Sequence, residues 1–189
     1  MWYLTGATNE AYVSSTESFS KQELDAIIQI FDDGKLKDGI AVDPTSPDVR
    51  KSKIGWVDNF NPDLEWLYRK LTDLTMEVNN NFFNYDLVSL EPLQLTEYSE
   101  DYEGQYKKHI DYGRTTSINR KLSFTLQLSD SLEYEGGDLL LHTSEEPLIM
   151  NKERGAISFF PSFTLHEVTP VTKGMRRSLV GWVSGPRFR

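Results

Sequence analysis

The stretch that decides the fold class is residues 163–182, which read FTLHEVTPVTKGMRRSLVGW. Apolar residues fall in short runs on both sides of the turn-prone pair Lys173-Gly174, and this predicts strands over 163–169 and 176–184. Similar runs, separated by turn-rich pieces, predict further strands upstream, at 87–98, 105–111, 120–128, 138–142 and 155–160. Many short strands at this spacing predict an antiparallel sandwich or barrel.

Before residue 85 the pattern is helical. Ser20 and Glu23 are the ends of a capping box, and apolar residues at helical spacing follow as far as Phe31. A second helix is expected over about 62–82, because Asn61-Pro62 places a capping side chain before a proline at the first helical position. The polar segment 35–53 contains two prolines and predicts an irregular connection.

These patterns predict an α+β chain that is mainly β. We expect a jelly roll (a double-stranded β-helix) with N-terminal helices packed on one sheet. The chain is expected to form a single domain over 1–189, in which 1–84 give helical N-terminal support and 85–189 form the jelly-roll core.

Composition narrows the class of protein. The 189 residues carry a net charge of −9, which argues against a general phosphate-binding surface and hence against a nucleic-acid partner. The chain has no cysteine, so disulfides, thiolate metal sites and thiol catalysis are excluded. We find no apolar run long enough to span a membrane and no signal-peptide pattern, and therefore expect a soluble, cytoplasmic protein without membrane partners.

Two of the three histidines stand in a pattern typical of a metal site. His109 and Asp111 are two residues apart near a strand end, so their side chains are expected on one face. His166 lies in another strand pattern and is the candidate third ligand. Two imidazoles and one carboxylate on one side of a metal leave the other coordination positions open, which suits non-haem Fe(II).

A guanidinium follows the second histidine of this set. Arg176 lies ten residues after His166, at the start of the last predicted strand. Because an arginine fork matches a carboxylate with two parallel hydrogen bonds, this arrangement is what a dicarboxylate chelate such as 2-oxoglutarate would need beside the iron.

The order of these motifs resembles the Fe(II)/2-oxoglutarate-dependent dioxygenases, and most of all their prolyl-hydroxylase-like branch. The resemblance covers about 85–189, with a weaker likeness upstream at Arg50-Lys51-Ser52 and Trp56. The motifs that carry it are His109-x-Asp111, Gly136-Gly137-Asp138-Leu139, Phe159-Phe160-Pro161-Ser162, His166 to Val171, Gly174-Met175-Arg176 and Trp182.

The resemblance implies Fe(II) as the metal, held by His109, Asp111 and His166, and 2-oxoglutarate as the co-substrate, held at its distal carboxylate by Arg176. It also implies that Tyr98 lines the co-substrate pocket. Gln127 stands where the family often has a tyrosine, and we take it as a further co-substrate contact. Ascorbate is compatible with this scheme as a reductant.

Strand parity separates Arg176 from its neighbour. The family places Trp182 inward, and counting back by twos puts Arg176 on the same face. Arg177 then points away, and we interpret it as a solvated charge at the sheet edge.

The resemblance favours hydroxylation of a prolyl residue in a peptide or protein, with release of succinate and CO2. Two alternatives stay open at this point: hydroxylation of a free amino acid or other small molecule, and a non-oxidative metal-binding jelly-roll module.

The remaining features receive structural interpretations. His142 is interpreted as a surface or loop residue, and Gly136-Gly137 as a turn with positive φ whose backbone donors are satisfied by Asp138. The acidic segment 99–106 is interpreted equally well as a lid over the site or as a plain solvated loop.

Overall fold

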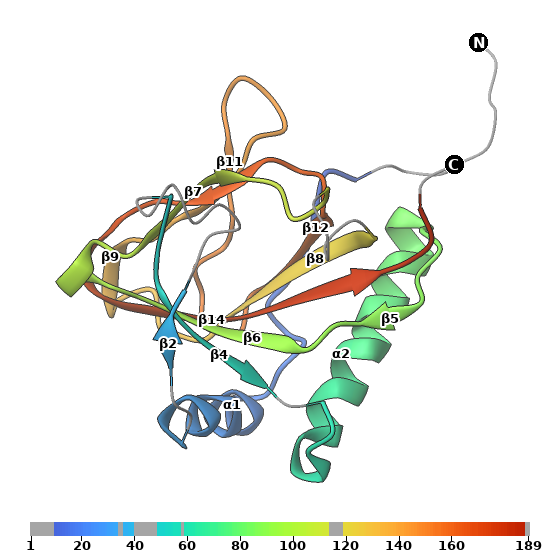
Figure 1. The fold of residues 1–189 in the computed structure, drawn as a ribbon, viewed down its shortest axis with the longest axis horizontal. Helices are drawn as coiled ribbons and strands as arrows, with labels where there is room; N and C mark the ends of the chain where they lie inside the picture. Colours follow the sequence, from blue (N-terminus) through green and yellow to red (C-terminus); the bar gives the residue numbers. More distant parts are fainter. Residues whose placement is uncertain (1–9, 34–35, 40–48, 58, 114–118, 188–189) are drawn as a thin grey trace.

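The computed structural model describes residues 10–33, 36–39, 49–57, 59–113 and 119–187. In these residues two antiparallel sheets face each other, and the two α-helices lie against the outer side of the larger sheet (Figure 1). The expected fold class, a jelly roll with N-terminal helices packed on one sheet, is confirmed.

Both helices begin as the sequence predicts. Helix α1 (Lys21–Asp33) opens with the capping box: the Ser20 N–H donates to the Glu23 carboxylate at 2.8 Å, and the Glu23 N–H donates to the Ser20 hydroxyl at 3.3 Å. Helix α2 (Glu65–Val78) follows a 3₁₀ turn (Pro62–Leu64) capped by Asn61, and it continues into a π-helical turn (Asn79–Phe83). Within the described ranges neither helix has the length and apolar character needed to cross a bilayer.

The strands divide between the two sheets. The larger sheet has the order β1 (Val13–Ser15), β12 (Ile157–Pro161), β8 (Arg120–Gln127), β14 (Val171–Ser184), β6 (Leu93–Ser99), β4 (Lys53–Val57) and β2 (Lys37–Asp38), with β5 (Ser89–Leu90) and β9 (Tyr134–Gly136) also paired to β14. The smaller sheet has the order β11 (Leu148–Ile149), β10 (Leu139–Leu141), β13 (His166–Val168), β7 (Gln105–His109) and β3 (Arg50–Lys51).

Two expectations about the strands are wrong. The segment 35–53 is not wholly irregular, because its described parts contain β2, β3 and the first residue of β4; residues 40–48 lie outside the described residues. The pair Lys173-Gly174 is not a turn between strands, because β14 runs through it with an irregular register against β9. Gly174 has a φ of 71° there, which only glycine adopts at little cost.

The first 84 residues also do more than pack as helices. Strands β1, β2 and β4 extend the larger sheet, and β3 forms an edge of the smaller one. Residues distant in sequence from the jelly-roll strands therefore contribute to both walls of the space between the sheets.

The larger sheet has two chemically different faces. Its helix-facing side is apolar and packs Leu95, Phe124 and Leu179 against side chains of α1 and α2, including Ile27 and Leu67. The opposite face looks toward the smaller sheet and carries buried polar side chains, among them Gln94, Thr96, Ser123, Gln127, Arg176 and Ser178. Buried polar groups need partners, so this inner face is suited to a binding site rather than to a closed core.

One glycine tests how tightly the apolar side is packed. A Cβ at Gly181 would lie 2.1 Å from the Phe124 ring, which is fully buried. We expect Gly181→Ala to lower the free energy of unfolding by about 1–3 kcal/mol through overpacking. Urea denaturation followed by circular dichroism measures this, and an unchanged midpoint would contradict the packing described here.

Candidate metal centre

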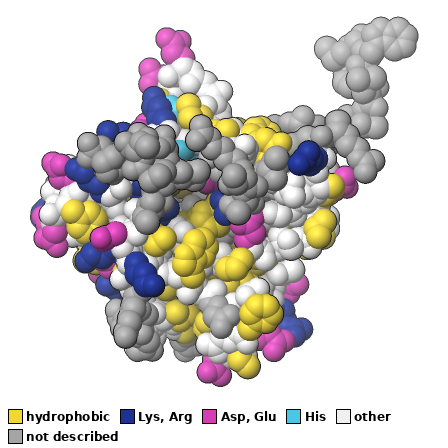
Figure 2. Space-filling view, viewed as in Figure 1, with side chains coloured by type: hydrophobic (Ala, Val, Ile, Leu, Met, Phe, Trp, Pro, Cys, Tyr) yellow, Lys and Arg dark blue, Asp and Glu magenta, His cyan; other side chains and the backbone are white. Residues whose placement is uncertain are grey.

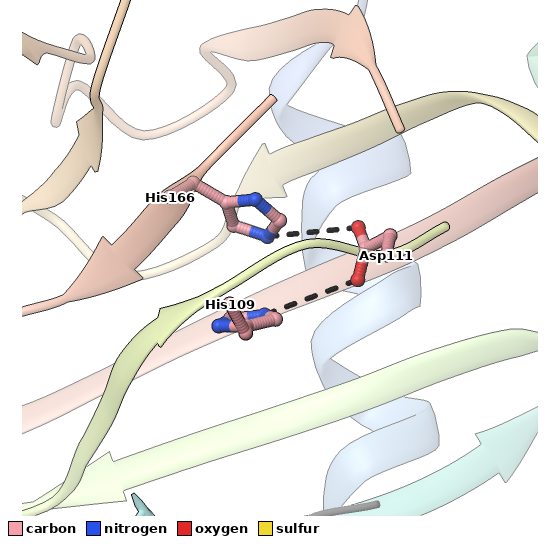
Figure 3. A group of neighbouring side chains, drawn as sticks. All are labelled: His109, Asp111 and His166. Carbon is pink, nitrogen blue, oxygen red and sulfur yellow. Dashed lines mark ion pairs between the residues drawn. The ribbon is translucent and has the colours of Figure 1, made fainter. Parts of the chain in front are cut away.

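The two imidazoles are brought together by strand pairing. His109 ends β7 and His166 begins β13, and these residues lie directly opposite each other in the antiparallel pair. Their ring centroids are 4.2 Å apart. Directly opposed side chains lie on the same face of a sheet, so both rings point into the space between the sheets (Figure 3).

Asp111 is positioned beside the two imidazoles by hydrogen bonds outside the strand pairing. It lies two residues beyond the end of β7, where the Asp111 and Tyr112 N–H groups donate to the Ser162 carbonyl at 2.9 and 3.1 Å. Its carboxylate oxygens lie 3.9 Å from Nε2 of His109 and 3.6 Å from Nε2 of His166. All three ligand atoms lie within 4.8 Å of one another, so the predicted set converges, as Figure 3 shows.

Hydrogen bonds orient all three side chains. Nδ1 of His109 lies 2.8 Å from the Lys107 carbonyl and Nδ1 of His166 lies 2.8 Å from the Thr164 carbonyl. Because a carbonyl only accepts, each Nδ1 carries the proton and each Nε2 offers its lone pair toward the centre. The Ser123 hydroxyl donates to Asp111 at 2.7 Å and also bonds the Ser162 hydroxyl at 2.9 Å.

The protonation states suit metal binding. Burial and the neighbouring His166 imidazole lower the pKa of His109 to about 3, so its ring is neutral at neutral pH. Burial alone would raise the pKa of Asp111, but the two imidazoles and the Ser123 hydroxyl outweigh it, and the carboxyl pKa lies below its usual value. A neutral His109 imidazole and an ionised Asp111 carboxylate are ligand forms that a divalent cation requires.

The metal ligands open into a cavity of about 280 Å³ between the sheets. Its lining includes Tyr98 and Arg176, which are cross-strand partners on β6 and β14, with the guanidinium carbon 5.5 Å from the Tyr98 ring centroid. Arg176 is only 2% exposed, and it forms no ion pair with any described residue. A buried guanidinium without a carboxylate is expensive, so this position favours an anionic ligand.

Gln127 lies beside this region rather than on the main cavity. Its amide donates to the Tyr134 hydroxyl at 2.5 Å, and Tyr134 lies next to the Arg176 guanidinium. Burial raises the pKa of Tyr134 while Arg176 lowers it. The family often has a tyrosine at the position of Gln127 on β8. In this protein a tyrosine hydroxyl is supplied by Tyr134 on β9 instead, and Gln127 orients it.

The residues present fit the cofactors that the resemblance implies. His109, Asp111 and His166 supply the nitrogen and oxygen donors that non-haem Fe(II) takes, and Arg176 supplies an unneutralised fork lining the same cavity.

Arg177 points away from the cavity, as strand parity predicts, but it is not a solvated edge charge. Its Nε donates to Glu97 at 3.0 Å, and its guanidinium lies over the Phe31 ring at 5.3 Å. Glu97 is buried, so the Arg177–Glu97 ion pair lies between the outer face of the larger sheet and α1. The expectation failed because α1 covers this face, which strand periodicity alone does not reveal.

His142 is not a plain surface residue either. Its side chain is 15% exposed and Nε2 lies 2.8 Å from the Glu167 carboxylate on the neighbouring strand β13. The predicted positive φ of Gly136 and Gly137 is confirmed, at 72° and 61°. Asp138, however, pairs with Lys152 at 2.9 Å instead of capping that turn.

Three further cavity-lining residues were not predicted as functional. Arg50 and Trp56 come from β3 and β4, and Arg120 begins β8. The segment Arg50-Lys51-Ser52 and Trp56 show only a weak likeness to the prolyl-hydroxylase-like branch. The local sequence pattern around Arg50, Trp56 and Arg120 does not indicate a functional role, because these residues reach the cavity only through the pairing of their strands with distant strands.

Comparison with known proteins agrees with this geometry. Residues 93–184 match the family described as the 2OG-Fe(II) oxygenase superfamily. The crystal structure of a Pseudomonas putida prolyl-4-hydroxylase aligns over 93% of both chains with a TM-score of 0.74 and 19% identity. A Trichoplax adhaerens prolyl hydroxylase, solved with a hypoxia inducible factor peptide fragment, aligns over 93% of this chain and 84% of its own with a TM-score of 0.78 and 17% identity.

Closer sequence relatives are PKHD-type hydroxylases. One from Synechococcus sp. (strain CC9311) is 42% identical over 81 residues, and one from Prochlorococcus marinus is 44% identical over 78 residues. These alignments cover 43% and 41% of this chain but only 37% and 35% of those proteins, so they span little more than a third of the relatives' length.

The matched residues 93–184 contain all three candidate ligands, so this part of the chain is similar to the 2OG-Fe(II) oxygenase superfamily in both sequence and ligand set. The solved prolyl hydroxylases share its fold.

The Ser123 hydroxyl gives a test of how the ligands are positioned. Because it donates to Asp111, we expect Ser123→Ala to weaken Mn(II) binding about 10- to 100-fold while leaving the fold intact. Calorimetric titration measures this. Ser158→Ala is the matched control, since Ser158 is also buried but bonds Ser14 instead of a ligand. Equal affinities in the two variants would contradict the role given to Ser123.

Proposed function

We propose that this chain is a dioxygenase that hydroxylates an unactivated C–H bond of a prolyl residue in a peptide or protein, with release of succinate and CO2. The observation that carries the proposal is one cavity lined both by the His-Asp-His set and by the buried Arg176, which forms no ion pair with the described residues. The non-oxidative jelly-roll alternative does not account for Arg176.

The residues at this site have distinct roles in the proposed function. Nε2 of His109, Nε2 of His166 and a carboxylate oxygen of Asp111 would hold the metal. Arg176 binds the distal carboxylate of 2-oxoglutarate through its fork, and Tyr98 packs beside it. Tyr134, whose hydroxyl accepts a hydrogen bond from Gln127, is in turn hydrogen-bonded to the Arg176 guanidinium.

The chemistry itself belongs to the bound metal and co-substrate. With both in place, one oxygen atom of O2 enters the substrate C–H bond and the other enters the succinate formed from 2-oxoglutarate, whose first carboxyl leaves as CO2. The protein supplies position and a largely buried cavity, in which apolar Leu139 and Phe160 limit the access of water to the reacting groups.

The prolyl substrate rests on likeness to other proteins. The structures most like this fold include prolyl 4-hydroxylases and one enzyme solved with a peptide fragment, and the sequence relatives are named PKHD-type hydroxylases. We take the described residues as one catalytic domain, since the N-terminal strands complete both sheets around the cavity.

The proposed metal ligands are tested by replacing Asp111, the one carboxylate among the three. Asp111→Ala removes the charged ligand, and we expect succinate release to fall to background in an assay with Fe(II), 2-oxoglutarate and a panel of prolyl peptides and amino acids. Wild-type protein should also develop a weak visible absorption band when Fe(II) and 2-oxoglutarate are combined without oxygen, and Asp111→Ala should not. Full turnover in this variant would refute the assignment.

The co-substrate assignment is tested by a neighbouring pair of arginines. Arg176→Lys should raise the 2-oxoglutarate concentration needed for half-maximal turnover by about 10-fold or more, because an ammonium cannot make the forked contact. Arg177→Lys is the matched control, since Arg177 pairs with Glu97 on the opposite face. Similar increases in both variants would overturn the assignment of Arg176.

A further inference from the structure

We propose that Arg50 selects the substrate by binding a carboxylate that the substrate carries close to the carbon that is hydroxylated. This inference rests on the dioxygenase activity of the proposed function and names the substrate class of the same site. The substrate class becomes a residue with a free carboxylate, as in a free amino acid or the C-terminal residue of a peptide, instead of an internal residue of a chain.

The position of Arg50 connects it to the metal centre. Its guanidinium carbon lies 4.7 Å from the centroid of the Tyr106 ring, and the Tyr106 ring stacks on the His109 ring with centroids 3.5 Å apart. Arg50 is therefore separated from a metal ligand by one aromatic ring, and it lines the same cavity as that ligand.

The guanidinium is held in place by neutral groups. Its Nε donates to the Ser52 hydroxyl at 2.8 Å and its Nη2 donates to the Gln94 side-chain oxygen at 2.7 Å. Neither partner carries a charge, and Arg50 forms no ion pair within the part of the chain that the structure describes. The fork is thus oriented while its positive charge stays unneutralised.

The other arginines near the cavity differ in this respect. Arg120 donates to both oxygens of Glu91, at distances of 2.7 to 3.1 Å, so its charge is already matched. Arg176 has the distal carboxylate of 2-oxoglutarate as its proposed partner. Arg50 is the cavity guanidinium for which neither the described residues nor the co-substrate supplies an anion.

Formal charges lead to the same conclusion. The positive charges of Fe(II) and Arg176 are balanced by the negative charges of the Asp111 carboxylate and the 2-oxoglutarate dianion, and Arg120 is balanced by Glu91. Among the described residues that line the cavity, this leaves the positive charge of Arg50 unbalanced in a partly buried site. A carboxylate on the substrate would balance it with a charge-assisted, two-point hydrogen bond.

The surroundings of Arg50 suit a small apolar body attached to that carboxylate. Trp56 is 57% exposed and lies 6.1 Å from Trp182 between ring centroids, and Ile110 is 47% exposed; all three line the cavity. In Figure 2 hydrophobic side chains gather at the middle of the face shown, with charged side chains around them. The chain as a whole is strongly acidic, so an anion is attracted by this local guanidinium and not by the general surface.

The test compares ligands that differ only in this charge. Protein is loaded with Fe(II) and saturating 2-oxoglutarate without oxygen, so that Arg176 is occupied, and is titrated with L-proline against L-prolinamide and with N-acetylglycylproline against its C-terminal amide. Tryptophan fluorescence reports binding, because Trp56 and Trp182 line the cavity. The first pair represents a free amino acid and the second a peptide end.

We expect the acid of at least one pair to bind about 10-fold or more tightly than its amide. Arg50→Gln should bring this ratio close to one, whereas Arg50→Lys should retain part of it, because the charge remains and the fork is lost. A purely structural role for Arg50 would weaken acid and amide alike and leave their ratio unchanged, and that result would overturn the proposal.

The proposal also fails if no pair shows an Arg50-dependent preference for the acid while 2-oxoglutarate still produces its visible band. In that case the proposed dioxygenase function stands and only the substrate class is wrong. Absence of the band in wild-type protein would instead contradict the proposed function, and this inference with it.

Discussion

The candidate metal centre depends on the register between two short strands of the smaller sheet. His109 and His166 meet because β7 and β13 pair with these residues directly opposite each other. A slip of one residue would turn one imidazole to the other face of the sheet. The pairing is irregular just beyond this point, between His166 and Val168, so the register at the histidines is a local feature of the strand ends. Asp111 then joins them from outside the strand, through the Ser162 carbonyl and the Ser123 hydroxyl.

A second constraint concerns the inner face of the larger sheet. The alternation of apolar and polar residues along β6, β8 and β14 would ordinarily predict one buried and one solvated face. Here both faces are buried, because the helices cover the apolar one and the smaller sheet covers the polar one. Polar side chains such as Gln94 and Arg176 thus lie in a cavity, where their unmet hydrogen bonds and charge make it a binding site.

Much of the fold could be predicted because its signals are local. The capping box at Ser20, the proline after Asn61 and the alternation along 120–128 each depend on neighbours a few residues away, and the structure confirms the elements they predict. The failures involve partners distant in sequence. Nothing in the sequence near Arg177 reveals that α1 covers it. Strand β3 has no local signal either, because its two residues form a strand only by pairing with β7.

The sequence by itself determined the chemistry available to this protein. The spacing of His109, Asp111 and His166 indicated a metal site, and the resemblance to the Fe(II)/2-oxoglutarate-dependent dioxygenases assigned these ligands and the role of Arg176. Only the tertiary structure decided which groups meet and which charges stay unmatched. It placed Tyr134 beside Arg176 and paired Arg120 with the Glu91 carboxylate, whereas the described residues give Arg50 no carboxylate partner. The physical reason is that side-chain type is a local property, whereas pairing and burial depend on contacts between strands far apart in the chain.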